Sequence, residues 1–412
     1  MKVTELNAGA DDATYIHMER YVNDGSPTGF TEMHKTSEGT NPFTGVERFP
    51  LLEFDDSDLE TVLLGDHNPY LRGAVSFAHP DSISSPVLHA AGRVLQESHF
   101  KVSPVAGGRT MILRDGNVGS GYLKMTYDVS RIGRVDRQLT LKHCVSSLEV
   151  SRTLKQAIDV GQLSSRTALL LETAARVTML PSTDGVFEWG TIFRERFPYP
   201  RPESHYSMVP GFSLFGRDRK NPADKPLIVQ LIEQGGYEAN EYLIDLLKMI
   251  VDCYWSIVHA CAMHIECHAQ NCLFEVAPDL RIARIIVKDM DSVEKDLPLA
   301  RHLGIGQKWD SYPYMCMTED IYYYPIRASY MYDFKLGEYL LSPLISCVSL
   351  DFGLDVGEFD RQIREYVQQR HLSGLPPAYF PEDGCWYDCD NTERAPGAAR
   401  RQYFPHSNPR FR

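Results

Sequence analysis

The chain has 412 residues and a formal net charge of −13, from 42 Lys and Arg side chains against 55 Asp and Glu. It is long enough to bury a large core divided among two or three subdomains. Its 43% hydrophobic and 24% charged residues are typical of an ordinary globular protein. The acidic balance argues against general binding to nucleic acid or to an anionic membrane, but it is compatible with a local basic pocket for an anion.

The sequence also bears on cellular location. The segment from Met1 to Asn7 lacks an apolar signal-peptide core, and no apolar run is long enough to span a bilayer. Nine cysteines is an odd number, and Cys253, Cys261 and Cys347 lie in apolar helical patterns where a thiol packs as a small hydrophobic group. These features predict a cytoplasmic protein with reduced thiols.

Three regions follow one another along the chain, and together they predict an α+β fold. Residues 1–103 are rich in Gly, Pro and Asp and contain only short helical patches. Residues 104–236 are mainly strands, and residues 237–412 are mostly helical. No low-complexity linker separates the regions, so we expect them to pack closely.

The middle region contains the patterns of an antiparallel sheet. Residues 109–113, 121–127 and 138–145 are predicted to form neighbouring strands. Apolar residues around 168–175 then predict a helix, and residues 187–194 predict another strand.

The third region begins with a long helix, because residues 240–262 carry apolar side chains at helical spacing. Residues 272–276 and 283–287 then read as two strands joined by a turn at 277–279. The helix and the hairpin would therefore deliver the segments that follow them to the same place.

A polar cluster occupies those two segments. It comprises Glu266, His268, Gln270, Asn271, Lys288 and Asp289. Carboxylate and amide oxygens hold Mg²⁺, and a His or Gln can contact phosphate, so the cluster suits a metal–nucleotide site. The simpler alternative is a polar loop that caps a buried helix. We rank it second, because ligand-type residues converge here without Gly or Ser between them.

Basic residues on the predicted strands offer a second half for such a site. Gly107-Gly108-Arg109-Thr110 leads the first strand, Lys124 lies on the next, and Arg137 follows further on. If their side chains share one face of the sheet, they could grip a triphosphate or a polycarboxylate. The alternative is pairing with acidic residues on an exposed surface, and the pattern alone favours it.

Two further basic positions are ambiguous when read alone. Arg194 follows an apolar strand, and Lys35 lies in a turn whose composition suits phosphate but which lacks the Walker spacing.

Taken together, these residues resemble the siderophore synthetases that work independently of non-ribosomal peptide synthetases, the aerobactin-synthetase-like family. The segment from Glu266 to Asn271 resembles the family's E-x-H-G-Q-N, and Lys288-Asp289 stands where the family has Arg-Asp. This block is the specific part of the resemblance, which spans most of the chain.

Weaker matches extend the resemblance. Gly107 to Thr110 resembles S-x-R-T without the serine, and Tyr122-Leu-Lys124 resembles the lysine strand after it. Gly133 to Arg137 resembles T-x-x-x-R with glycine for threonine, Thr191 to Glu195 resembles I-x-R-E, and Lys35 to Gly39 resembles a degraded K-S-R-x-G.

Two points of the resemblance are less well defined. One is a partial match in the first region, and the other is the register of the lysine strand. Ala78-His79-Pro80 resembles part of an H-P-W-Q segment. An alternative register gives Lys142 and Arg152 the roles assigned to Lys124 and Arg137, although the first register fits the family's spacing from Arg109 better.

The resemblance implies a reaction and an assignment of roles. ATP and a carboxylic acid, often citrate or another polycarboxylate, give an acyl-adenylate and pyrophosphate, and an amine or hydroxyl then attacks the acyl group. The catalytic residues implied are His268, Arg109, Lys124 and Arg137. Those implied to bind nucleotide are Lys35, Gly107, Thr110, Arg194, Gln270, Asn271 and Lys288. The Mg²⁺ ligands implied are Glu266, Asn271 and Asp289.

The resemblance further implies a thumb, fingers and palm arrangement for residues 1–103, 104–236 and 237–412, with a shortened first region. Dimers are common in the family, so a homodimer is one expectation. The lost serine and threonine hydroxyls put citrate itself in doubt, and Lys288 gives up the bidentate geometry of arginine.

Two other functions compete with this one. A kinase-like phosphotransferase would show a similar order of His-containing loop, hairpin and metal-binding Asp, but it needs an Asp base where Ala269-Gln270 stands. A non-catalytic descendant of a synthetase would explain the lost hydroxyls, yet it has no need of His268, Asn271 and Asp289 together.

Overall fold

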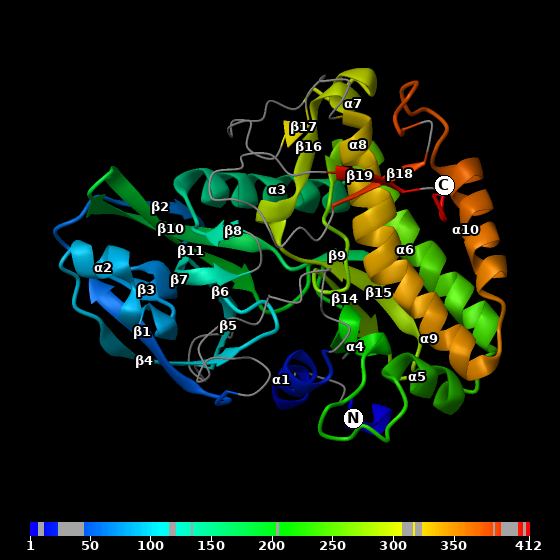
Figure 1. Ribbon diagram of the computed structural model, residues 1–412, viewed down its shortest axis with the longest axis horizontal. Coiled ribbons are helices and arrows are strands. Elements are labelled where there is room, and N and C mark those ends of the chain that lie inside the picture. The colour runs from blue at the N-terminus through cyan, green and yellow to red at the C-terminus, as the bar shows by residue number, and fades with distance from the viewer. Residues whose placement is uncertain are drawn as a thin grey trace.

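A computed structural model describes residues 1–6, 12–23, 45–114, 121–132, 135–202, 206–306, 316–317, 324–381, 384–388, 403–406 and 409–412. Figure 1 shows a large sheet on one side of the molecule and a helical layer on the other, with helix α3 between them. Lys35 and Gly133 lie outside the described residues, and the side chain of Arg137 does too.

The large sheet has eight strands in the order β2-β10-β11-β6-β5-β4-β1-β3, and every pairing is antiparallel. Its strands are β1 (Phe49–Asp55), β2 (Thr61–Gly65), β3 (Val75–Ala78), β4 (Gln96–Pro104), β5 (Thr110–Leu113), β6 (Gly121–Met125), β10 (Glu172–Ser182) and β11 (Gly185–Glu195). The strands predicted at 109–113 and 187–194 are confirmed as β5 and β11, and β6 covers most of the one predicted at 121–127. Strands on both sides of position 103 belong to this one sheet.

The strand predicted at 138–145 is wrong, because this segment opens α3 (Leu141–Asp159). Thr140 caps the helix: its Oγ1 accepts a hydrogen bond from the His143 amide at 3.3 Å, while His143 Nδ1 accepts one from the Thr140 amide at 3.0 Å. Cys144 and Leu148 then pack against the sheet, one helical turn apart. Lys142 and Arg152 therefore lie on a helix, so neither can be the lysine or arginine of a strand.

The helix predicted around 168–175 is also wrong. The segment forms β9 (Thr167–Leu169) and the start of β10. Its Ala, Leu and Glu residues favour helix locally. However, β10 lies between β2 and β11 in the sheet, where Ala174 and Ala175 are buried, and this tertiary environment outweighs local propensity.

A second sheet joins distant parts of the chain in the order β12-β14-β15-β9. Strands β14 (Cys272–Val276) and β15 (Ile282–Val287) form the predicted hairpin, while β12 (Ser207–Pro210) pairs with β14 and β9 runs parallel to β15. The turn at 277–279 is confirmed by a hydrogen bond from the Leu280 amide to the Ala277 carbonyl at 2.8 Å. This sheet holds both polar segments of the predicted site.

Smaller sheets complete the strands. They are β7 (Tyr127–Ile132) with β8 (Val135–Arg137), β13 (Met263–His264) with β16 (Glu294–Asp296) and β17 (Cys316–Met317), and β18 (Cys385–Asp388) with β19 (Tyr403–His406).

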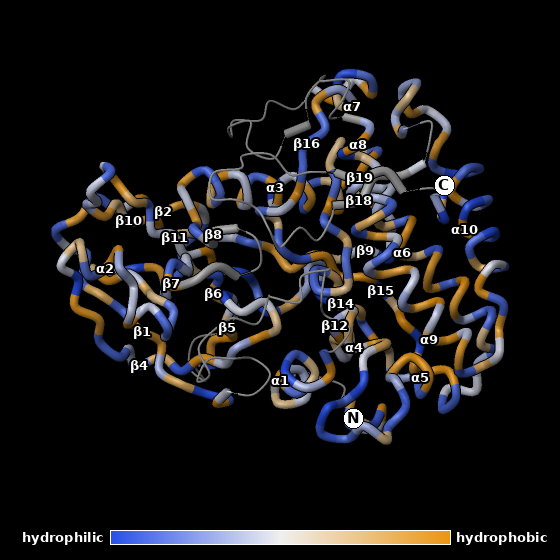
Figure 2. The backbone as a smooth tube through the Cα atoms, viewed as in Figure 1, coloured by the Kyte–Doolittle hydropathy of each residue, from blue (hydrophilic) through white to orange (hydrophobic). Residues whose placement is uncertain are grey.

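The helical layer is built around α6 (Ala239–Cys261), which confirms the long helix predicted at 240–262. Trp255 and Tyr254 are fully buried in it, and Figure 2 shows apolar residues concentrated where α5, α6 and α9 pack together. The helices besides α3 and α6 are α1 (Asp12–Tyr21), α2 (Pro86–Ala90), α4 (Gly211–Phe215), α5 (Leu227–Gly235), α7 (Leu297–His302), α8 (Tyr324–Ser329), α9 (Ser342–Phe352) and α10 (Val356–Arg370).

Short 3₁₀ helices occur at η1 (Val3–Glu5), η2 (Pro69–Leu71), η3 (Pro80–Ser84) and η4 (Met290–Ser292), and a π-helix, η5, spans Tyr330–Leu341. Within the parts of the chain that are described, none of the helices is both long and apolar enough to cross a membrane.

Candidate active site

Basic side chains from the large sheet meet acidic side chains from the loop after β15. Lys124, on β6, contacts both Asp289 and Asp291, and its Nζ lies 2.5 Å from Asp289 Oδ1. Arg194, on β11, donates to the same Asp289 oxygen at 2.6 Å. Arg109 Nη2, from the turn before β5, lies 3.6 Å from Asp291 Oδ2. The structure therefore brings the predicted Arg109, Lys124 and Arg194 to one place.

Antiparallel pairing explains why these residues converge. Lys124 lies opposite Thr110 on β5 and opposite Ile192 on β11, so Arg194 is two positions further along the neighbouring strand. Residues two apart on a strand point to the same face, which aligns Lys124 with Arg194. The alternative of an exposed charged surface is wrong for these two, since both side chains are only 3% exposed.

Asp289 pairs with two cations of the large sheet. It has a left-handed backbone with φ of 76°, which turns the chain sharply after β15. Burial acts to raise the pKa of Asp289, but the positive charges of Lys124 and Arg194 outweigh it and hold that pKa far below its ordinary value. Asp289 therefore joins the loop after β15 to the basic side chains of the sheet.

The loop from Glu266 to Asn271 lies directly beside this cluster. The Lys288 amide donates to the Asn271 carbonyl at 3.0 Å, so the two polar segments are joined by their backbones. The loop also meets the turn that precedes β5: a Cβ added to Gly107 would lie 3.6 Å from Gln270 Nε2. Segments far apart in sequence thus form one continuous polar wall.

The ring of His268 is held in a defined orientation. Its Nδ1 accepts a hydrogen bond from the Gln270 amide at 3.3 Å, which places the proton on Nε2, 3.6 Å from Glu266 Oε2. Burial lowers the pKa of His268 below its ordinary value, against the opposing influence of Glu266. Asp289 is a smaller influence on the same pKa, so His268 and Asp289 lie in one electrostatic environment.

Lys288 does not face the carboxylates of the cluster. Its Nζ lies 3.4 Å from Glu19 Oε1 on α1, and Glu19 is almost completely buried. Glu19 also accepts hydrogen bonds from the Ala106 amide at 3.0 Å and from the Tyr15 hydroxyl at 2.7 Å. Lys288 and Glu19 thus link α1 to the turn that carries Gly107 and Arg109.

Sequence reasoning missed four residues of this site. Asp291 follows Asp289 by two positions, and its spacing was a usable signal. Glu172 holds Arg194 through Nε at 3.0 Å and Nη2 at 2.5 Å, but a lone acid on a segment predicted to be helical gave no signal. Glu19 gave no signal in the sequence either.

The fourth is His143, in the segment predicted to be a strand. Burial lowers the pKa of His143, and Asp291, Arg109 and Lys124 influence it further, which places its ring at the edge of the cluster.

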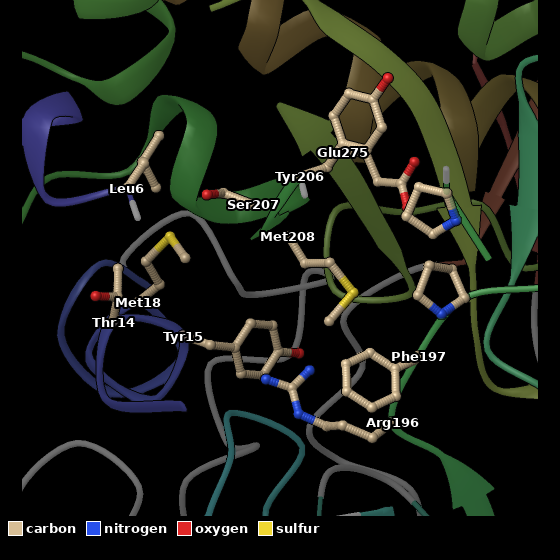
Figure 3. Close-up of a pocket in the computed structure, with 12 residues that line it drawn as sticks. Leu6, Thr14, Tyr15, Met18, Arg196, Phe197, Tyr206, Ser207, Met208 and Glu275 are labelled. Carbon is tan, nitrogen blue, oxygen red and sulfur yellow. The ribbon is translucent and has the colours of Figure 1, made fainter. Parts of the chain in front are cut away.

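A cavity of about 70 Å³ borders α1. Figure 3 shows Tyr15, Met18, Phe197 and Met208 around it, with the Arg196 guanidinium facing the Tyr15 ring at 4.6 Å. None of the predicted site residues that the structure describes lines this cavity.

The residues present suit Mg²⁺ together with a nucleotide better than a metal alone. Among the described residues, no group of three or more His, Cys, Asp or Glu side chains is arranged to hold a metal. Mg²⁺ is usually held through one or two carboxylates and substrate phosphates, and Asp289 and the Asn271 amide carry oxygen donors of the kind that Mg²⁺ prefers.

No protein-family model matches the sequence, and no curated protein matches it. Among solved structures, aerobactin synthetase IucA from a hypervirulent pathotype of Klebsiella pneumoniae is similar, with a TM-score of 0.66 and 12% identity over 98% of this chain and 79% of that one. An ATP-bound structure of IucA has a TM-score of 0.62 and 14% identity over 81% of this chain and 63% of that one.

Petrobactin biosynthesis protein AsbB from Bacillus anthracis is also similar, with a TM-score of 0.64 and 15% identity over 86% of this chain and 68% of that one. At such identities the likeness shows the fold. The chain has the fold of these siderophore synthetases, which confirms the predicted α+β class and, at the level of fold, the resemblance seen in the sequence.

Proposed function

We propose that the protein is an ATP-dependent, AMP-forming synthetase that joins a carboxylic acid to an amine or a hydroxyl in the biosynthesis of a siderophore or a related small molecule. One observation carries the proposal. Arg109, Lys124 and Arg194 from the sheet converge on Asp289 and Asp291 beside the loop that holds His268. The shared fold supports it, since ATP is bound to one of the similar synthetases.

The charges suit this reaction. Attack of a carboxylate on the α-phosphate of ATP brings two anions together, so positive groups must offset their repulsion and the charge that develops on phosphate. Lys124 and Arg194 already occupy a buried position, where such interactions are stronger than in water. Arg109 is the more exposed of the three cations and would face the substrate side.

On the opposite wall, Asp289 and Asn271 would hold Mg²⁺, with Glu266 as a third candidate ligand. The ion would supply positive charge that offsets the negative charge of the phosphates when the nucleotide is bound. His268, which is neutral and carries its proton on Nε2, would donate a hydrogen bond to phosphate or to the acyl-adenylate. Gln270 and Gly107 would line the nucleotide between the loop and the sheet.

Product analysis tests the proposal. The protein is incubated with ATP, Mg²⁺, a panel of carboxylic acids and hydroxylamine, and the nucleotide products are identified. AMP and pyrophosphate together with a hydroxamate are expected for one of the acids. ADP would overturn the proposal in favour of a kinase-like phosphotransferase, and tight ATP binding without turnover would favour a non-catalytic synthetase descendant.

A variant locates the site independently of the choice of acid. His268→Ala is expected to abolish AMP formation while the circular dichroism spectrum and the unfolding midpoint stay close to those of the wild type. His259→Ala is a suitable control, because the His259 ring lies on α6 away from the loop and donates from Nε2 to the His371 carbonyl at 2.8 Å, just after α10. Unimpaired turnover in His268→Ala would show that the site lies elsewhere.

A further inference from the structure

The π-helix η5 lies between α8 and α9 (Figure 1) and is continuous with both. It spans twelve residues, which is unusual, because π-helical geometry is rare and mostly limited to a single turn, frequently at functional sites. Its residues are almost all buried, including Lys335, which is 2% exposed. The ammonium group of Lys335 is therefore buried on an unusual type of helix.

Two contacts connect η5 to the candidate active site. Lys335 Nζ lies 2.6 Å from Glu266 Oε1, and the other oxygen of Glu266 faces His268 Nε2. The Tyr339 carbonyl accepts a hydrogen bond from the Ala269 amide at 3.1 Å, in the middle of the loop. The helix therefore holds both the side chain at the start of the loop and the backbone at its centre.

The same helix is held in turn by residues 409–412. Phe411 is buried and packs against Gly337, where an added Cβ would lie 3.2 Å from the Phe411 ring. The Tyr332 hydroxyl donates to the Phe411 carbonyl at 3.0 Å. Arg412 Nε lies 3.0 Å from each carboxylate oxygen of Asp333, which is 4% exposed. These contacts hold η5 at Gly337, which lies between the two residues that touch the loop, and one turn before it at Tyr332 and Asp333.

We propose that Lys335 is a positioning residue that holds Glu266 against His268, and that the docking of Phe411 and Arg412 keeps η5 in the place this requires. The inference rests on the proposed function for its effect on turnover. Its structural part, that Lys335 orders the loop from Glu266 to Asn271, stands without it.

The main test compares Lys335→Met with Lys335→Arg. Met keeps the apolar stem but leaves Glu266 without its cation, whereas Arg restores the charge. We expect Lys335→Met to raise the KM for ATP and to lower kcat/KM about 10–100-fold, as is usual when a residue that orients a metal or substrate ligand is lost. Lys335→Arg is expected to recover most of this loss. Lys225→Met is the matched control, because Lys225 pairs with Glu233 and Asp351 on the outside of the helical layer.

Hydrogen–deuterium exchange provides a readout without ATP or turnover. Lys335→Met is expected to speed exchange in the peptide 265–272, with peptides from β10 and β11 unchanged. Unchanged exchange in that peptide, or equal loss of activity in Lys335→Met and Lys225→Met, would overturn the role of Lys335. If the wild type forms no AMP, the proposed function fails while this exchange result still decides the positioning role.

Phe411→Ala tests the second link. It removes the packing on Gly337 but leaves Lys335 and Glu266 unaltered. We expect faster exchange in the peptide 265–272 and a higher KM for ATP, both smaller than in Lys335→Met. A lower unfolding midpoint with unchanged exchange in the loop would overturn the role of the docked residues.

Discussion

Two buried arginines on neighbouring strands, Arg176 on β10 and Arg194 on β11, have different surroundings. Arg176 donates to both oxygens of Asp56 and to the Leu71 carbonyl, and Ser76 and Thr178 donate to the same carboxylate. Asp56 is 1% exposed, so this cluster is closed to solvent.

Arg194 forms an open cluster instead. It is shared between Glu172, which is fully buried, and Asp289, whose side chain is 22% exposed. One of its two acceptors is therefore partly exposed to solvent. The first cluster is closed and holds the sheet together, whereas the second is the one that we propose for a substrate site, although both look alike in the sequence.

The largest effect is expected from breaking the closed cluster. Asp56→Ala leaves Arg176 buried without its carboxylate, which costs about 3–5 kcal/mol of folding stability. Urea unfolding followed by circular dichroism measures the loss. Asp58→Ala is the control, because it removes the exposed partner of Arg93 and should change stability far less. Equal losses in the two variants would contradict the distinction between closed and surface pairs.

Breaking the open cluster should reduce activity more than it reduces folding stability. Asp289→Ala removes the proposed metal ligand but leaves Lys124 with Asp291 and Arg194 with Glu172. We expect AMP formation to fall at least about 100-fold. The unfolding midpoint should stay closer to that of the wild type than the midpoint of Asp56→Ala does. Normal turnover in Asp289→Ala would remove the basis for calling this cluster a site.

A buried, hydrogen-bonded histidine also supports the turn next to the open cluster. The pH dependence of folding stability can reveal its contribution. His79 Nε2 contacts the Gly108 carbonyl at 3.2 Å, and its Nδ1 accepts from the Asp81 amide at 3.1 Å. Burial lowers the pKa of His79 to about 4, from an ordinary value of 6.5. The unfolded chain therefore binds more protons between these two values, and folding stability falls as the pH is lowered from about 6.5 to about 4.

Comparison with His79→Gln isolates this contribution. Relative to the variant, the wild type should lose on the order of 3 kcal/mol of unfolding free energy across that range, since one pKa unit corresponds to about 1.4 kcal/mol. Parallel pH profiles for the two proteins would show that His79 is not held in its neutral form.

The smallest effect is expected at Lys142, the alternative to Lys124. Lys142 is exposed on α3, so Lys142→Ala should change kcat/KM by less than about twofold. Lys124→Ala removes a buried cation of the open cluster and should lower it at least about 100-fold. A larger loss in Lys142→Ala than in Lys124→Ala would contradict the assignment of the lysine to β6.

The sequence predicted the elements with a clear period and clear ends. The long helix and the hairpin after it were confirmed, because α6 has apolar residues at helical spacing and β14 and β15 are bounded by a turn. It failed at 138–145 and 168–175, where short apolar runs suit either a helix or a strand. There the capping pair of Thr140 and His143, and the place of β10 in the sheet, decided the structure.

The candidate site likewise has residues that the sequence indicated and contacts that it did not. Residue types next to a helix and a hairpin, together with the family resemblance, pointed to His268, Asn271 and Asp289. Nothing in the sequence connected Arg194 to Glu172 or Lys335 to Glu266. Arg137 and Lys35 stay predictions, since the side chain of the first and the whole of the second lie outside the described residues.

By itself, the sequence determined which chemical groups the protein contains and which short segments carry them. The spacing of apolar residues and the positions of turn residues can be read within a single segment. Only the tertiary structure decided which of its many charges meet. Ion pairs between Lys124 and Asp289 join residues 165 positions apart, and their partnership depends on strand order and on burial in a shared core. Both arginines are buried, but burial closes one cluster to solvent, whereas the other includes the partly exposed Asp289.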